Sequence, residues 1–369
     1  MFDEPVVAAS TIAWIAFVLG LVFGYAGNRS NFCTMGAVSD IVNMGDWTRM
    51  RMWAAAVGVA ILGTSILQLI GVLDTDDSIY TGPRVIWFSN VLGGALFGIG
   101  MTLASGCGSK TLIRIGGGNL KSLIVFVFLG ISAYMTMRGL FGVWRTQYID
   151  TISFELTTSQ DLPSILAGFG LARETALTAL AAAIGGGLLV FTLISREARQ
   201  LETLLGAIAI GAVCVAGWYV TAHVGFVEEH PRTLERAFIG TNSGQAESFT
   251  FVAPVAYTLE LFMLWSDTSR IFTFGIAGVL GVIAGSAVYA ATSRTWRVES
   301  FMDAGDLVRH IVGGILMGFG GVTALGCTIG QGVTGFSTLA VGSLLTTAAI
   351  IAGAAVTMKV QYWLMMRED

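Results

Sequence analysis

The stretch that decides the fold is Gly93-Gly94-Ala95-Leu96-Phe97-Gly98-Ile99-Gly100-Met101-Thr102-Leu103-Ala104-Ser105-Gly106-Cys107, an apolar run rich in glycine that ends in Gly-Cys. It recurs as Gly313-Gly314-Ile315-Leu316-Met317-Gly318-Phe319-Gly320-Gly321-Val322-Thr323-Ala324-Leu325-Gly326-Cys327. The two copies align without a gap at a separation of 220 residues (327 − 107), and most glycines and both final residues are identical. An internal repeat in apolar sequence is typical of a membrane transporter.

A fainter third copy lies near the N-terminus, as Gly20-Leu21-Val22-Phe23-Gly24-Tyr25-Ala26-Gly27-Asn28-Arg29-Ser30-Asn31-Phe32-Cys33. Its two leading glycines precede the cysteine by the same spacing that separates Gly94 and Gly98 from Cys107. Three of the four cysteines therefore end a stretch of the same kind, and only Cys214 stands outside the pattern.

The composition identifies the class of protein. Hydrophobic residues make up 54% of the chain and charged residues only 12%, whereas a soluble domain carries about 25% charged residues. Such a chain cannot cover its surface with solvated groups, so we expect an integral membrane protein. The 48 glycines allow membrane helices to approach one another closely. Nothing in the net charge of −4 points to a nucleic-acid partner.

Apolar segments of about 20 residues, long enough to cross a bilayer, occur about nine times. They are approximately 8–26, 53–73, 85–105, 120–140, 175–194, 204–222, 272–291, 307–325 and 338–363. A further segment, 249–265, is shorter and contains Pro254 and Glu260. Because a carboxylate at bilayer depth is costly, we interpret this segment as a re-entrant helix that reaches only half of the depth.

Basic residues follow the odd-numbered spans, which favours an N-terminus outside and a cytoplasmic C-terminus. If 249–265 does not cross, the two main copies cross in opposite directions; if it does, they are parallel. The charge bias favours inversion. The predicted fold is an all-α integral membrane protein with about nine transmembrane helices, short re-entrant half-helices and a pseudo-twofold, inverted repeat. We expect one transmembrane domain over 1–369, with repeat halves at approximately 1–145 and 200–369 joined by 146–199.

The chemistry of the repeat centres on its Gly-Cys ends, each followed by small residues that suit a broken helix. Irregular backbone at membrane depth is tolerated where it lines a cavity. A short helix that starts there directs its N–H groups and positive dipole end into the cavity, which favours an anion. A thiol adds a weak donor and a polarisable sulfur, so a thiol-lined path suits a sulfur-containing anion.

The predicted substrate path comprises Cys33, Cys107, Cys327, Gly106, Gly108, Gly326, Lys110 and Gln331. A single buried cysteine is usually a packing residue, and we interpret Cys214 in this way; three at equivalent positions of a repeat argue against it. Lys110 is equally well explained as a topology signal at the membrane surface. We find no phosphate-binding loop, nucleophile elbow or metal-ligand spacing, so no enzymatic activity, metal or organic cofactor is predicted.

The Gly-Cys motifs resemble those of the YeeE/YedE family of sulfur-transport membrane proteins, whose characterised members take up thiosulfate. The resemblance rests on Asn31-Phe32-Cys33-Thr34-Met35-Gly36, Ser105-Gly106-Cys107-Gly108-Ser109-Lys110-Thr111-Leu112 and Leu325-Gly326-Cys327-Thr328-Ile329-Gly330-Gln331-Gly332. It implies an hourglass-shaped bundle of about nine membrane helices plus half-helices. It also implies a thiosulfate route marked by the three motif cysteines, and delivery in many members to a small cytosolic sulfur carrier of the TusA type.

These observations predict an importer of thiosulfate or a related sulfur anion in the plasma (inner) membrane. Its expected partners are the anion, membrane lipid and a TusA-like carrier. Three alternatives stay open at this point. A membrane sulfurtransferase would carry a persulfide to a cytosolic carrier on an accessible thiolate. A copper(I) channel would use the thiolates as ligands. A purely structural subunit would tolerate replacement of all three cysteines.

Overall fold

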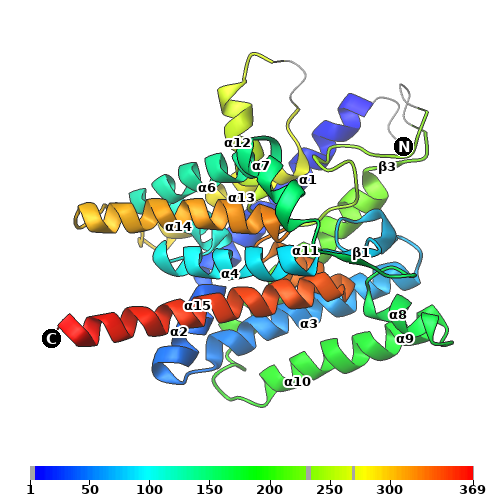
Figure 1. The fold of residues 1–369 in the computed structure, drawn as a ribbon, viewed down its shortest axis with the longest axis horizontal. Helices are drawn as coiled ribbons and strands as arrows, with labels where there is room; N and C mark the ends of the chain where they lie inside the picture. Colours follow the sequence, from blue (N-terminus) through cyan, green and yellow to red (C-terminus); the bar gives the residue numbers. More distant parts are fainter. Residues whose placement is uncertain (1–4, 230–233, 268–270, 369) are drawn as a thin grey trace.

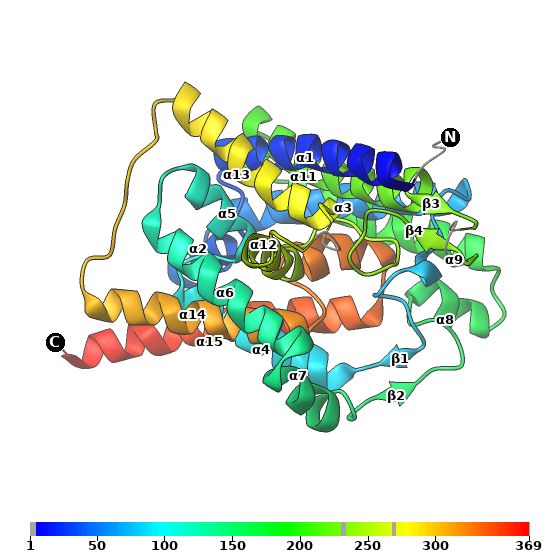
Figure 2. The same ribbon diagram turned by 90° about the horizontal axis from the view of Figure 1, so that it is seen from above.

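The computed structural model describes residues 5–229, 234–267 and 271–368, and these are mostly helical. Most of the long helices run roughly along one direction, as the horizontal ribbons of Figure 1 and the view from above in Figure 2 show. The chain enters the first helix at one end of the bundle and leaves the last helix at the opposite end.

The helices are, in chain order, α1 (Pro5–Arg29), α2 (Thr34–Met44), α3 (Thr48–Leu69), α4 (Trp87–Leu103), α5 (Gly108–Gly116), α6 (Leu120–Arg138), α7 (Leu140–Trp144), α8 (Leu162–Gly168), α9 (Arg173–Leu180), α10 (Gly187–Leu193), α11 (Leu201–Tyr219), α12 (Ala253–Met263), α13 (Phe274–Thr292), α14 (Ala304–Thr323) and α15 (Val341–Glu368). Short 3-10 or π-helical segments are η1 (Thr75–Asp77), η2 (Arg145–Ile149), η3 (Ala181–Gly186), η4 (Val220–Val224), η5 (Gly330–Gly335) and η6 (Phe336–Thr338). Two antiparallel pairs of two-residue strands join β1 (Arg84–Val85) to β2 (Phe154–Glu155) and β3 (Phe226–Val227) to β4 (Ala237–Phe238).

Among the described residues, eight helical stretches are long and apolar enough to cross a membrane. They are Ala9–Met44, Thr48–Leu69, Trp87–Gly116, Leu120–Arg138, Arg173–Leu193, Leu201–Val224, Phe274–Thr292 and Val341–Arg367. The protein is therefore a multi-pass membrane protein. Large apolar side chains such as Trp14 and Val18 face outward from the bundle, as contact with lipid requires.

The ninth predicted span, 307–325, is not among these eight stretches. It forms α14, a helix of 20 residues, but its first two turns carry Asp306, Arg309 and His310. These polar side chains lower the hydropathy at the start of the helix. The sequence thus predicted this helix correctly. The helix is less apolar than the other predicted spans.

The two Gly-Cys stretches form α4 and α14, which cross in antiparallel contact through their glycines. A Cβ built on Gly93 would lie 2.7 Å from the carbonyl oxygen of Gly320, and one built on Gly313 would lie 2.7 Å from that of Gly100. A side chain at these positions would force the helices apart, so only glycine permits the approach. Gly93 corresponds to Gly313 in the sequence alignment, and Gly100 corresponds to Gly320. The two contacts are therefore the same contact with the copies exchanged.

The helices that flank this crossing also make close contacts at glycines. A Cβ built on Gly98 of α4 would lie 2.8 Å from the backbone nitrogen of Ala354 in α15. A Cβ built on Gly318 of α14 would lie 2.8 Å from the backbone nitrogen of Ala133 in α6. Gly98 and Gly318 are equivalent positions in the alignment, so α15 packs on α4 as α6 packs on α14.

A second group of helices packs around α1. Phe17 and Leu21 of α1 meet Gly281 and Gly285 of α13 in the same order, so α1 and α13 run parallel. The start of α11, at Gly206, instead meets the end of α1, and α11 runs antiparallel to both. The chain consequently leaves α11 and enters α13 at the same end of the bundle.

The segment 249–265 lies between α11 and α13 in the sequence and contains α12, an 11-residue helix. It begins at Ala253 with a proline in its first turn, and α12 is too short to be one of the eight stretches. Its carboxylate Glu260 is buried and accepts a hydrogen bond from the hydroxyl of Tyr134 at 2.8 Å. The carboxylate that made this segment doubtful as a span thus has a polar partner inside the protein.

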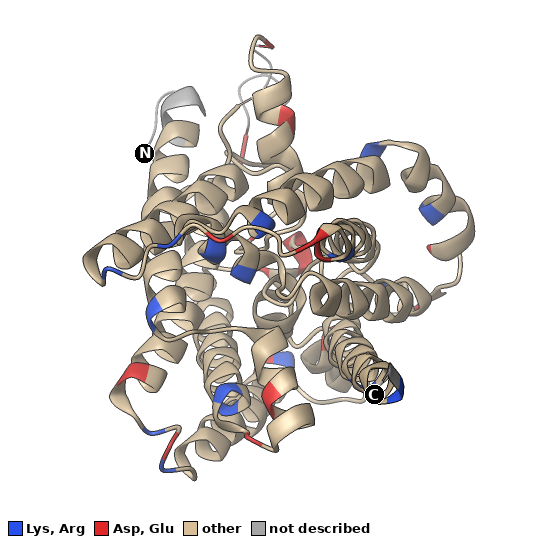
Figure 3. Cartoon of the chain, turned by 90° about the vertical axis from the view of Figure 1, so that its left-hand side faces the viewer, with Lys and Arg blue, Asp and Glu red and all other residues tan. Residues whose placement is uncertain are grey.

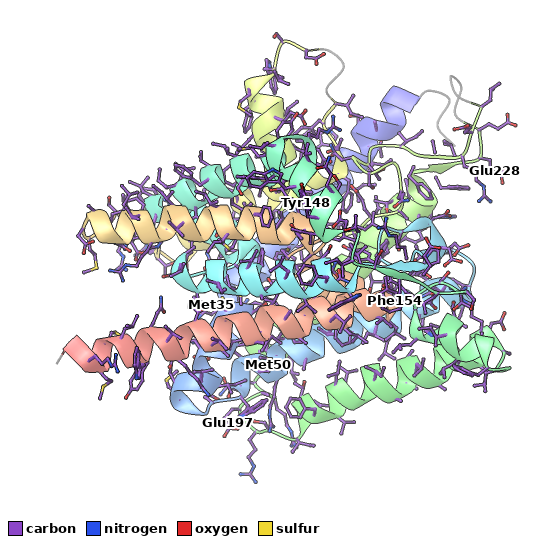
Figure 4. All side chains as sticks on the ribbon, in the orientation of Figure 1. Met35, Met50, Tyr148, Phe154, Glu197 and Glu228 are labelled. Carbon is purple, nitrogen blue, oxygen red and sulfur yellow. The ribbon has the colours of Figure 1, made fainter. Side chains whose placement is uncertain are left out.

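Polar connections lie mainly at the ends of the bundle. Figure 4 shows Glu228, which follows β3, at the right-hand end, and Glu197, in the α10–α11 connection, at the lower edge. His230, which the sequence places beyond the α11 span, lies outside the described residues.

Candidate functional site

The three motif cysteines follow the same sharp turn. Asn31, Ser105 and Leu325, each two residues before its cysteine, have left-handed backbone with φ of 52°, 56° and 58°. Such a conformation costs about 1–2 kcal/mol for a residue other than glycine, so it requires support from neighbouring bonds. That support is the same each time. The N–H of the residue before each cysteine donates to a carbonyl five positions earlier, from Phe32 to Gly27, Gly106 to Met101 and Gly326 to Gly321.

This pattern is the Schellman motif, which ends a helix and satisfies its last carbonyl groups. It closes α1, α4 and α14 in turn. The chain then starts a new helical turn at the cysteine itself. The carbonyl of each cysteine accepts a bond from the N–H four positions later, at 3.0 Å for Cys33, 2.9 Å for Cys107 and 2.7 Å for Cys327. One short pattern of sequence thus encodes the end of a long helix, a break and a helix start, three times.

Each thiol lies at the start of the helical segment that follows it. The sulfur of Cys33 accepts the N–H of Gly36 at 3.3 Å, and that of Cys327 accepts the N–H of Gly330 at 3.3 Å. Cys107 holds the equivalent position at the start of α5, but its sulfur makes no such capping hydrogen bond. At Cys33 and Cys327, a cysteine thus replaces the serine, threonine or aspartate that usually caps a helix N-terminus. Cys107 and Cys327 are fully buried, and Cys33 is 7% exposed.

The structure brings two of the thiols together. The sulfurs of Cys33 and Cys107 lie near each other, although the two residues are far apart in the sequence. The hydroxyl of Ser109 lies 3.3 Å from the sulfur of Cys107. The hydroxyl of Thr328, which directly follows Cys327, is buried near that sulfur and has no hydrogen-bond partner among the described residues.

Cys327 has a partner outside the repeat. The hydroxyl of Thr250 lies 3.9 Å from its sulfur, and Thr250 comes from the segment that leads into α12. Neither Thr250 nor Thr328 was among the residues predicted for the substrate path. Thr328 was detectable as a hydroxyl adjacent to a motif cysteine, whereas no local pattern distinguishes Thr250.

Gln331 and the three glycines predicted for the substrate path differ from one another in how closely they are packed and bonded. The amide nitrogen of Gln331 donates to the carbonyl of Ala324 at 2.6 Å, while its buried amide oxygen has no partner among the described residues. A Cβ on Gly326 would lie 3.1 Å from the side chain of Gln331. Gly106 and Gly108 have more space, with nearest atoms at 3.5 and 3.4 Å. Close packing therefore does not explain these two glycines.

Two cavities border the third motif. One of about 260 Å³ is lined by Gly326, Thr250 and Val252 together with Arg145 and Glu247. A smaller one of about 190 Å³ is lined by residues that include Leu325 and Gln331. Burial raises the pKa of Glu247, in the β4–α12 connection, to about 7, and a hydroxyl donor on Ser243 offsets part of this effect.

A larger cavity, of about 920 Å³, borders the other two motifs. Its wall includes Asn31 and Lys110, which flank Cys33 and Cys107 in the sequence, and the ammonium group of Lys110 donates to the amide oxygen of Asn31 at 2.7 Å. Figure 3 views the end of the bundle at which the last helix, α15, ends, with lysine and arginine in blue. The two smaller cavities thus border the motif of Cys327, whereas the cavity of about 920 Å³ borders the motifs of Cys33 and Cys107.

These features can be compared with known proteins. The sequence profile that describes sulphur transport matches residues 29–356, which include all three cysteine motifs. The chain belongs to the sulphur transport (YeeE/YedE) family. The family that the motifs indicated in the sequence is thereby confirmed.

Two named relatives are similar along most of their length. The thiosulfate transporter TsuA of Spirochaeta thermophila is 25% identical over 347 residues, which cover 92% of this chain and 96% of the relative. The thiosulfate transporter TsuA of Escherichia coli is 27% identical over 326 residues, which cover 86% and 85%. Both relatives are named as transporters rather than enzymes.

Proposed function

We propose that this sulphur transport family protein imports thiosulfate, or a closely related sulfur anion, along a path that passes Cys327, Cys107 and Cys33. The observation that carries the proposal is the threefold use of one local structure. A helix ends in the same turn three times, and each time a buried thiol lies at the next helix start. The names of the two relatives support the choice of substrate.

The chemistry of the thiol region suits such an anion. Charge in a low-dielectric interior must be offset by donors, because an unpaired anion there is prohibitive. The N–H groups after each cysteine and the hydroxyls of Ser109, Thr250 and Thr328 would supply donors, and the thiols would add weak, soft ones. Several weak donors in series allow an anion to bind at one position and still move to the next.

The arrangement of the helices supports an inverted repeat in this proposal. The exchanged contacts of α4 and α14 fit a local twofold axis that relates antiparallel copies. With α14 as a ninth span and α12 as a half-depth helix, the chain alternates direction from α1 to α15. The N-terminus then lies outside and the C-terminus in the cytoplasm, which puts the large basic cavity on the cytoplasmic side. The path would deliver its anion there, within reach of a TusA-like carrier.

The sulfurtransferase alternative needs a thiolate that is open to solvent. Cys107 and Cys327 are each 0% exposed. This burial favours transport over persulfide chemistry.

The test is uptake of sulfur-labelled thiosulfate by cells that lack their own uptake systems. We expect Cys33→Ala, Cys107→Ala and Cys327→Ala each to abolish most of the uptake. Cys214→Ala is a matched control, because Cys214 is also 0% exposed but belongs to α11 and to none of the three repeated motifs. Wild-type uptake no better than an empty vector would exclude thiosulfate as the substrate. Full uptake by the three motif variants would exclude the thiol path.

A further inference from the structure

The large cavity beside Lys110 has an unusual charge distribution, and we call it the basic vestibule. Its charged wall residues are Lys110, Arg114, Arg294, Arg297 and Glu299. Four cations thus face one carboxylate across about 920 Å³. They come from α5 and from the connection between α13 and α14, which lie far apart in the sequence.

Two of these cations are held by neutral groups. The guanidinium of Arg114 donates to the carbonyl of Ser105 at 2.6 Å, within the turn that precedes Cys107. The ammonium of Lys110 donates to the amide oxygen of Asn31 at 2.7 Å. Within the part of the chain that the structure describes, neither group makes an ion pair with a carboxylate. Their positions are therefore fixed by neutral groups rather than by ion pairs.

The opposite wall is also fixed. The connection after α13 is bonded to the turn before α6, from the N–H of Arg297 to the carbonyl of Gly117 at 3.1 Å and from the N–H of Leu120 to the carbonyl of Glu299 at 2.9 Å. The carboxylate of Glu299 accepts the amide of Asn119 at 2.6 Å and pairs with Arg297. The carboxylate of Glu299 thus orients Arg297, and the four cations and one carboxylate of the wall leave an excess of three positive charges (4 − 1).

We propose that the basic vestibule is a binding site for a small divalent oxyanion. Two negative charges offset most of the excess of three positive charges, and guanidinium groups donate in a planar fork that fits tetrahedral oxyanions. The cavity is larger than one such anion, so the ligand is held by charge and hydrogen bonds together with water. Sulfate and thiosulfate share this chemistry. The site lies beyond the thiols and does not depend on whether the chain transports anions.

Trp296 gives a direct probe, because it lines the vestibule and is 57% exposed. The experiment measures quenching of tryptophan fluorescence in the purified full chain by iodide, an anion, and by acrylamide, a neutral quencher. The difference between wild type and Trp296→Phe isolates the signal of this one residue among the nine tryptophans. We expect sulfate and thiosulfate to protect Trp296 from iodide but not from acrylamide.

The matched variants are Arg294→Gln, in the vestibule, and Arg196→Gln, in the α10–α11 connection and outside its wall. Loss of one charge-assisted contact should raise the half-protecting sulfate concentration about tenfold in Arg294→Gln. Arg196→Gln should behave as wild type. Stronger protection by thiosulfate than by sulfate would show that the site also recognises the terminal sulfur atom of thiosulfate. Equal protection would show that the site recognises only the charge and shape of the anion.

Two results would overturn the proposal. Protection by potassium chloride equal to that by sulfate at matched ionic strength would mean general screening rather than a site. Equal sulfate concentrations for half-protection in Arg294→Gln and Arg196→Gln would mean that the vestibule cations do not bind the anion. Neither result would bear on uptake through the thiols, which is measured separately.

Discussion

Glu247 should make uptake depend on external pH. It lines the cavity of about 260 Å³ beside Gly326, on the side that we propose to face outward. Arg145, Tyr80 and Tyr257 line the same cavity. Arg145 is already paired with a carboxylate, at 3.2 Å from Asp150, and cannot fully compensate a second one. An ionised Glu247 would therefore repel an entering anion.

The size of the expected change in uptake follows from the raised pKa of Glu247. Burial raises the pKa of Glu247 to about 7, so the carboxyl is neutral below this pH and ionised above it. About 90% of it is neutral at pH 6 and about 10% at pH 8. A carboxylate about 5 Å from a dianion repels it by several kcal/mol at an effective dielectric constant of about 20. Only the neutral form then admits the anion, and the uptake rate should fall about ninefold from pH 6 to pH 8.

The assay is the initial rate of labelled thiosulfate uptake into proteoliposomes with a fixed internal pH and a varied external pH. Glu247→Gln should keep a high rate across the range, because glutamine stays neutral. Glu228→Gln, an exposed position in the preceding connection, is the control and should fall as wild type does. A wild-type rate that does not change, or an equal fall in Glu247→Gln, would refute the reasoning.

Two further substitutions test the packing around the thiols. Gly320→Ala should lower the free energy of unfolding by about 1–3 kcal/mol, because the new Cβ would lie 2.6 Å from the carbonyl oxygen of Gly93. Gly186→Ala, with no neighbouring atom within 4 Å, should be neutral or slightly stabilising, and equal melting temperatures for the two variants would contradict the close crossing. Asp40→Asn should cost about 1–3 kcal/mol, because it removes the carboxylate of a partly buried pair with Arg49 at 2.6 Å. An unchanged melting temperature in detergent would show that this pair does not stabilise the fold.

Much of the fold could be predicted from the sequence because its determinants are local. Span length and hydropathy depend on about 20 consecutive residues, and the breaks before Cys33, Cys107 and Cys327 depend on only a few. The bonds that form each turn join residues five positions apart or fewer. Repetition of the same short pattern therefore indicated the same local structure. The helix α14 was also predicted, although a few polar side chains in its first turns weaken its hydropathy, so that it is not among the eight long apolar stretches.

The membrane class, the family, the helix breaks and the equivalence of the three cysteines thus follow from the sequence. Which thiols lie near each other depends on the tertiary structure, since Cys33 and Cys107 belong to helices that pack together only in the folded bundle. It also placed Thr250 beside Cys327 and gathered the cations of the basic vestibule from distant segments. The physical reason is that these groups interact through space, after glycine-mediated helix packing has closed the chain, and no spacing along the sequence encodes their distances.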